Sequence, residues 1–181
     1  LVSGNFYFIE NQYGVDFPDS KLMANKEIMN GIGHNRPCFY SLIDNATGVY
    51  WFIPISSQVA KFQQIYDKKM NKNKEVDTIV FGFVMGHKKA FLIQNMFPAT
   101  PEYVKNEYID SITHQPVKIN NALKHELNQK AKKVLSLQRK GFHLIFPDVL
   151  KIERELIFNR IVAQAIKEAA PALKETEPSE E

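Results

Sequence analysis

The alternation of apolar and polar positions predicts an antiparallel sheet in the first half of the chain. Runs of aromatic and β-branched residues favour strands. Such runs lie at 5–9, 38–44, 49–53, 78–85 and 89–94. Turn residues at 44–48 and 86–88 join neighbouring runs, which predicts two antiparallel hairpins. A sheet of about five strands is therefore expected.

Apolar residues recur at helical spacing in the second half of the chain and predict long helices. The main one extends from Val117 to Arg139 and carries an apolar stripe that must dock on the sheet. Gly141 ends this helix, and Pro147 opens a last one. Residues 21–33 mix apolar positions with Asn and Gly, which favours a short helix or an irregular excursion over a strand. The expected fold class is α+β.

The chain is expected to form one domain followed by a tail. Its 181 residues are the size of one ordinary domain, and 44% hydrophobic residues suffice for a core. We therefore expect a single domain over residues 1–167. Residues 168–181 are acidic and too polar to pack, so a disordered tail is expected there.

Two serines mark the point where a strand gives way to a helix. The apolar run at 49–53 reaches Pro54, Ser56 and Ser57 follow, and apolar residues then recur at helical spacing. The first N–H groups of a helix have no intrahelical partners and carry a partial positive charge. These amides and the two hydroxyls can together hold a phosphate, with Lys61 one turn further along the same helix face. Alternatively, Ser57 only caps the helix.

A second polar segment is expected beside these serines. His34, Asn35 and Arg36 precede the first strand of the predicted hairpin. In an antiparallel hairpin the start of one strand lies against the end of the other, which places this segment close to Ser56 and Ser57. Cations and hydroxyls at one place suit phosphodiester chemistry, in which negative charge grows on the phosphate. RNA supplies its own 2′-OH nucleophile, so its cleavage needs a base and charge stabilisation but no metal.

Basic residues are concentrated in two parts of the chain. The net charge is only +3 because four of the acidic residues lie within the last eight positions. The first cluster is Lys61, Lys68, Lys69, Lys72 and Lys74, and the second is Lys118, Lys124, Lys130, Lys132, Lys133, Arg139 and Lys140. A lysine-rich face is often only solvated surface, but two such faces favour a polyanionic partner. We expect Lys68, Lys69 and the second cluster to bind RNA.

Several function classes are disfavoured. Cys38 is the single cysteine, which excludes an intramolecular disulfide and favours a reducing compartment. No apolar run reaches the roughly 18 residues of a membrane span, so a cytoplasmic protein is expected. The histidines show no metal-ligand spacing, His87 and His114 are expected at surface turns, and neither a metal nor a cofactor is expected. A hydrolase built on Ser57 and His34 would lack the Gly-x-Ser-x-Gly turn, and Gly-rich phosphate loops are absent.

Motifs along most of the chain resemble those of a known toxin family. The matching elements are Phe6-Tyr7-Phe8-Ile9 with Tyr13, Arg36 before a strand, Pro54-Ile55-Ser56-Ser57, Asn95-Met96-Phe97-Pro98 with Thr100-Pro101, and the closing basic helix. They resemble the endoribonuclease toxins of type III toxin–antitoxin systems. This family includes ToxN, AbiQ and, as the most similar member, CptN. The resemblance extends from Asn5 to Ile157.

The resemblance implies a fold, a reaction and a partner. The fold is a compact α+β domain related to the MazF and Kid toxins, with a strongly bent antiparallel sheet of the SH3-like barrel type. The reaction is cleavage of single-stranded cellular RNA by 2′-OH attack, which leaves a 2′,3′-cyclic phosphate and a 5′-OH. The partner is a small pseudoknotted RNA antitoxin, in a closed assembly with more than one copy of each molecule. The alternative is a non-catalytic RNA-binding protein that uses the same basic faces.

The resemblance also implies site residues. It assigns an active-site tyrosine to Tyr13, a basic position that is usually lysine to Arg36, and a hydroxyl pair to Ser56 and Ser57. The family often has a lysine two residues after the second hydroxyl, but Val59 stands here, so that role passes to Lys61. His34 and Asn35 have no clear counterpart. The general base therefore stays open between Tyr13 and His34.

Overall fold

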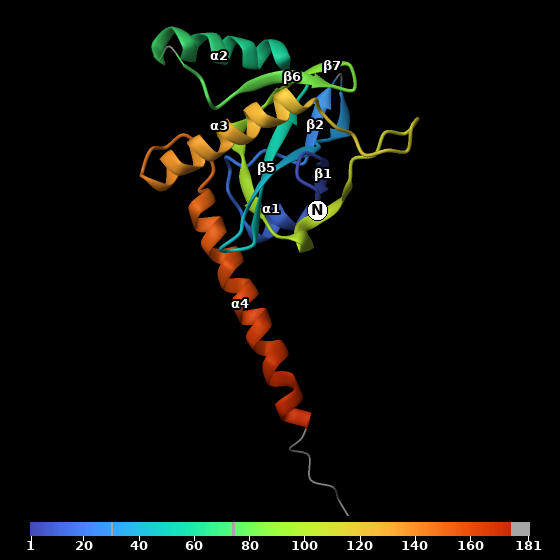
Figure 1. Ribbon diagram of the computed structural model, residues 1–181, viewed down its shortest axis with the longest axis vertical. Helices are drawn as coiled ribbons and strands as arrows, with labels where there is room; N and C mark the ends of the chain where they lie inside the picture. The colour runs from blue at the N-terminus through green and yellow to red at the C-terminus, as the bar shows by residue number, and fades with distance from the viewer. Residues whose placement is uncertain (30, 74, 175–181) are drawn as a thin grey trace, which may run out of the picture.

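The computed structural model describes residues 1–29, 31–73 and 75–174, and its core is a seven-stranded antiparallel sheet (Figure 1). The strands are β1 (Phe6–Ile9), β4 (Cys38–Asp44), β5 (Val49–Ser56), β6 (Val80–Val84), β7 (His87–Phe91), β8 (Phe97–Ala99) and β9 (Val104–Glu107). Their order is β6-β7-β5-β4-β1-β9, with β8 paired to β5. Within the described residues no ladder joins β6 to β9. The ladders of the described residues therefore leave the sheet open and form no closed barrel, whereas a strongly bent sheet of the SH3-like barrel type was expected.

The two predicted hairpins are confirmed. β4 pairs with β5 from Cys38↔Pro54 to Asp44↔Val49, and β6 pairs with β7. β5 extends beyond the expected end at residue 53, to Ser56. Pro54 lies inside this strand and still takes part in hydrogen bonding through its carbonyl, to which Leu92 N donates at 3.0 Å. Proline lacks only the N–H, so it can occupy a strand position that needs no donor.

The expectation for residues 21–33 was wrong, because part of this stretch belongs to a second, two-stranded sheet. β2 (Lys26–Met29) pairs with β3 (Ile32–Asn35). The polarity of β2 is inverted relative to an ordinary strand: Glu27 is 7% exposed and Ile28 is 71% exposed. A pattern search looks for apolar residues inside and polar ones outside, so this hairpin gives no strand signal.

The remaining elements are helices, two of them long. They are α1 (Gln12–Asp16), α2 (Val59–Asn73), α3 (Asn121–Arg139), α4 (Val149–Lys174) and the short 3-10 helices η1 (Ile93–Asn95) and η2 (Pro101–Tyr103). α3 starts later than expected, because the Asn120 side chain accepts from Leu123 N at 2.8 Å and caps it there. Its predicted apolar stripe, which includes Leu127 and Val134, is buried. α3 crosses the sheet, whereas α2 lies along the β6–β7 hairpin (Figure 1).

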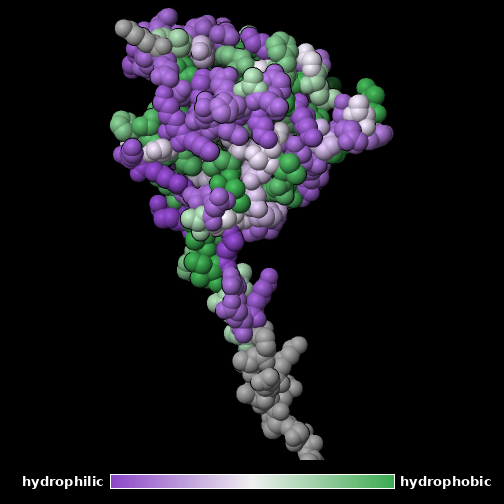
Figure 2. All heavy atoms as spheres, in the orientation of Figure 1, coloured by the Kyte–Doolittle hydropathy of each residue, from purple (hydrophilic) through white to green (hydrophobic). Residues whose placement is uncertain are grey.

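The last helix, α4, projects away from the sheet (Figure 1). It remains helical to Lys174, beyond residue 168 where a tail was expected to begin, and residues 175–181 lie outside the described part of the chain. Figure 2 shows a largely hydrophilic surface over the body and apolar patches along α4. In the described ranges, no helix combines the length and apolar character that a membrane crossing requires.

Candidate active site

A cavity of about 590 Å³ lies where the β2–β3 hairpin, the end of β5 and the β6–β7 hairpin meet. Its lining residues are Phe8, Glu27, His34, Asn35, Arg36, Pro37, Ile55, Ser57, Val84, Met85, His87, Lys89 and Tyr108. Four of the seven residues predicted to be catalytic therefore line the same cavity: His34, Asn35, Arg36 and Ser57. The β4–β5 register explains this, because Cys38↔Pro54 sets the residues before β4 against the end of β5.

Glu27 is the acid of this cavity, and the sequence did not indicate it. Its Oε1 accepts a hydrogen bond from Ser56 Oγ, and its Oε2 accepts one from Ser57 N at 3.0 Å. Burial alone would raise the pKa of the Glu27 carboxyl. The hydrogen bonds from Ser56 and Ser57, with the charges of Arg36 and Lys89, outweigh burial and hold that pKa below its ordinary value. Glu27 is therefore an ionised carboxylate at neutral pH.

Arg36 is held from three sides. Nε donates to Ala24 O at 3.0 Å, and Nη1 donates to Ile55 O at 2.9 Å. Nη1 also lies 3.6 Å from Glu27 Oε1. The guanidinium thus joins the segment before β2 to β5, and the carboxylate of Glu27 balances its charge.

The two predicted hydroxyls have different environments. Ser56 is 1% exposed, donates to Glu27, and accepts from Gln58 N at 3.1 Å. Ser57 is partly exposed and lines the cavity, and Lys89 Nζ donates to its Oγ at 2.5 Å. α2 begins at Val59, and the Ser57 hydroxyl contacts Lys89, so a helix-cap role alone does not describe it.

The cation that contacts Ser57 comes from β7 and not from α2. Lys61 is exposed, and its Nζ lies 5.6 Å from the centroid of the Phe62 ring. It does not line the cavity, because Ser57 precedes α2 and does not share a helix face with Lys61. Lys89 reaches Ser57 because the β5–β7 ladder pairs Ser56 with Ala90. Only a known strand register would have indicated Lys89.

Tyr13 lies elsewhere. It is 4% exposed, its Oη donates to Pro98 O at 2.7 Å, and its ring packs against Phe17 and Phe97. Burial raises the pKa of the Tyr13 phenol well above its ordinary value. It lines a second cavity, of about 260 Å³, and is not among the residues around Ser57 and Arg36.

Two histidines, His34 and His87, line the first cavity, and both are exposed. His87 was expected at a surface turn, and it is the first residue of β7 directly after that turn. The described residues contain no group of three His, Cys, Asp or Glu side chains that could hold a metal ion. The groups of the cavity lining that can transfer protons are the two imidazoles, the carboxylate of Glu27, the phenol of Tyr108 and the ammonium of Lys89.

Several lysines of the predicted RNA-binding set have partners within the protein. Lys69 Nζ donates to Thr78 Oγ1 at 2.8 Å and to Gln94 Oε1 at 2.6 Å, and burial lowers its pKa. Lys124 Nζ donates to Ser3 O at 2.8 Å. The ammonium groups of Lys69 and Lys124 therefore make hydrogen bonds to other parts of the protein.

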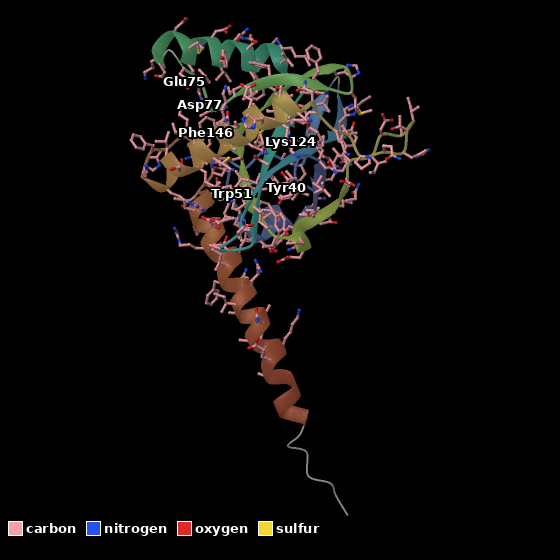
Figure 3. The ribbon with its side chains drawn as sticks, in the orientation of Figure 1. Tyr40, Trp51, Glu75, Asp77, Lys124 and Phe146 are labelled. Carbon is pink, nitrogen blue, oxygen red and sulfur yellow. The ribbon has the colours of Figure 1, made fainter. Side chains whose placement is uncertain are left out.

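Two lysines in the middle of α3 are also paired with acids, one with acids from another segment of the chain and one with an acid of α3 itself. Lys133 Nζ lies 3.0 Å from Glu75 Oε1 and 2.6 Å from Asp77 Oδ2, and these acids lie on the segment between α2 and β6 (Figure 3). Lys130 pairs with Glu126 at 2.9 Å.

The end of α3 lines a third cavity, of about 440 Å³, to which Lys132, Arg139 and Lys140 contribute. Arg139 is bound there by Asp44 at 2.9 Å and by Glu153 at 2.5 Å. Four exposed lysines of the predicted set have no carboxylate of the described residues within 4.0 Å. They are Lys68, Lys118, Lys132 and Lys140.

Comparison with known proteins shows with which structure this chain shares its fold. No protein-family model matches the sequence, and no curated protein matches it. The structure is similar to that of AbiQ, a lactococcal anti-phage endoribonuclease that belongs to the type III toxin–antitoxin system, with a TM-score of 0.60. The two chains are 15% identical, and the match covers 88% of this chain and 99% of AbiQ. At this identity the likeness establishes a shared α+β fold, in which an antiparallel sheet carries long helices.

Proposed function

We propose that this protein is an endoribonuclease toxin of the type III toxin–antitoxin class, with a sheet bent in the SH3-like manner of that class. It cleaves single-stranded RNA without a metal ion. The observation that carries the proposal is the cavity at the end of β5, where Ser57 Oγ, Lys89 Nζ and the histidines meet within an AbiQ-like fold. Hydroxyl, ammonium and imidazole groups are the ones that phosphodiester transfer requires.

The reaction is an internal transesterification. The 2′-oxygen of one ribose attacks the adjacent phosphorus, the O2′–P bond forms, and the P–O5′ bond breaks. A base takes the 2′-OH proton, and an acid gives a proton to the departing 5′-oxygen. The products are a 2′,3′-cyclic phosphate and a 5′-OH.

The roles follow from placement in the cavity. Ser57 holds a phosphate oxygen, and Arg36 contributes positive charge from the buried wall. His34 lines the cavity, is exposed, and is one of the proton-transfer groups, with Asn35 next to it in the sequence. Tyr13 is assigned a supporting role, because its hydroxyl is directed at the Pro98 carbonyl.

The partner that fits this function is an RNA antitoxin. We propose that a small pseudoknotted RNA inhibits the protein in a closed assembly with more than one copy of each molecule, and that both act in the cytoplasm. The exposed lysines Lys68, Lys118, Lys132 and Lys140 are its expected phosphate contacts, since phosphate neutralisation supplies most of the affinity of such surfaces.

The test uses the purified full chain and an end-labelled, unstructured RNA in EDTA. Discrete cleavage with a cyclic-phosphate end supports the proposal. Retention of the RNA without cleavage supports the alternative, a non-catalytic RNA-binding protein. An RNA with 2′-O-methyl groups throughout is the matched control, because it lacks the nucleophile and must stay intact.

A further inference from the structure

The two cations of the first cavity differ in how their charge is compensated. Arg36 lies against Glu27 in a buried ion pair, and its Nε and Nη1 already donate to backbone carbonyls. For Lys89, the described residues include no carboxylate within 4.0 Å of Nζ, and its one recorded hydrogen bond goes to Ser57 Oγ. An anion that enters the cavity therefore meets one cation paired with a buried carboxylate at 3.6 Å and one cation with no carboxylate of the described residues within 4.0 Å.

The position of Lys89 is set by the sheet. β7 is paired on both edges: Ala90 faces Ser56 of β5, and Lys89 faces Gly82 of β6. The side chain of Leu123 from α3 packs directly over Gly82, where a larger residue would collide with it. Because successive side chains on a strand point to opposite faces, Lys88 points away from the cavity, and its Nζ lies 5.1 Å from the centroid of the Phe81 ring.

The hydroxyl beside Lys89 is also the one that can exchange partners. Ser56 Oγ is buried and bonded to both Glu27 and Gln58 N, so a phosphate would have to break two internal bonds to reach it. Ser57 Oγ lies at the cavity surface, and its backbone N–H is fixed by Glu27. The hydroxyl of Ser57 can thus donate to an incoming oxygen while Lys89 stays in contact with both.

We propose that Lys89 is a catalytic residue, which contacts a non-bridging oxygen of the scissile phosphate together with Ser57. This assignment rests on the proposed ribonuclease function and deepens it. Lys89 supplies from β7 the charge that α2 does not, since Val59 stands at the start of that helix and Lys61 points to solvent. The ammonium stabilises the dianionic phosphorane as the O2′–P bond forms and the P–O5′ bond breaks.

The decisive variant is Lys89→Met, which keeps the length of the side chain and removes its charge. Cleavage of a short RNA should slow by about 10²–10³-fold, the usual effect of losing one contact to a developing oxyanion. Lys89→Arg should recover part of the rate. Lys88→Met and Lys61→Met are the matched controls, and both should cut within about twofold of wild type. A Lys89→Met protein with the wild-type melting temperature and the wild-type rate overturns the proposal.

A sulfur substitution tests the contact itself. RNA with an Rp or Sp phosphorothioate at the cleaved bond should slow the wild-type protein for one diastereomer, and Lys89→Met should lose that preference. If Lys89→Met still prefers one phosphorothioate diastereomer as the wild type does, the proposed contact is overturned.

Binding of the same RNA with a 2′-O-methyl group at the cleaved position separates the two proposals. If wild type cuts no RNA, the proposed function fails. A binding affinity that drops about tenfold in Lys89→Met, and not in Lys88→Met, would still place Lys89 on a phosphate, and unchanged binding would overturn that placement.

Discussion

Arg36 Nη1 lies 3.6 Å from Glu27 Oε1, and the two side chains are only 8% and 7% exposed. The pair joins the β2–β3 hairpin to the end of β5, because Arg36 also donates to Ile55 O and Glu27 accepts from both serines. Removing one partner of a buried ion pair costs about 3–5 kcal/mol, whereas replacing both by apolar groups often costs little. This contact is what makes the hairpin a wall of the cavity.

Glu27→Gln is expected to lower the free energy of unfolding at neutral pH by about 3–5 kcal/mol, because the buried charge of Arg36 loses its partner. The pKa of Glu27 is lower in the folded protein than its ordinary value: burial raises it, and the serine hydrogen bonds and Arg36 more than compensate. Its contribution is therefore present above the unfolded-state pKa of about 4.3 and is lost as the pH falls through the folded pKa. Urea unfolding at neutral and acid pH measures both effects.

Two further variants control this result. Glu102→Gln changes an exposed acid and should alter stability by less than about 0.5 kcal/mol. The double variant Glu27→Leu with Arg36→Met should lose less than the sum of the two single losses, since it leaves no unpaired buried charge. Additive losses would contradict the pairing.

Replacing each serine separates structure from chemistry. Ser56→Ala should cost about 1–3 kcal/mol of stability, because Glu27 Oε1 loses its hydroxyl donor and Gln58 N loses its acceptor. Ser57→Ala should change stability by less than about 0.5 kcal/mol and abolish both RNA cleavage and growth inhibition. Thermal melting and cleavage of labelled RNA distinguish the two. A Ser57→Ala protein that cuts at the wild-type rate would remove Ser57 from the site.

The antitoxin-binding face can be tested by the salt dependence of binding. Lys132→Ala with Lys140→Ala should reduce the slope of log K against log salt by about one unit per lost phosphate contact. Lys130→Ala with Lys133→Ala is the matched pair, and its effect should be smaller, since those ammonium groups already contact acids. Both double variants should still cut a short unstructured RNA. The opposite ranking would mean that RNA displaces the internal acids.

Cys38 reports on the integrity of the sheet. It is 3% exposed, and burial raises the pKa of its thiol to about 12. The reactive thiolate is therefore scarcely populated at pH 8 in the folded protein. Iodoacetamide should modify Cys38 only after urea unfolds the protein, which mass spectrometry detects. Rapid modification of the native protein would show that β4 is not held as described.

The sheet hairpins and the main helix follow from local patterns in the sequence. Turn residues between apolar runs indicate the hairpins at 38–53 and 78–94, and apolar spacing indicates the buried face of α3. These signals act between residues close in the chain, so they can be interpreted without the fold. The meeting of Arg36 and Ser57 follows for the same reason, because one hairpin register brings the two strand ends together.

The charged part of the cavity was decided by tertiary structure alone. Glu27 is buried on a strand whose apolar neighbour Ile28 faces solvent, an inversion that no periodicity predicts. Lys61 has the right spacing for a helix face, but Lys89 makes the contact, because the β5–β7 ladder sets it beside Ser57. A shift of one residue in that ladder would turn every side chain of β7 to the other face. The identity of the cation therefore depends on the register between distant strands, which only the packing of the whole sheet determines.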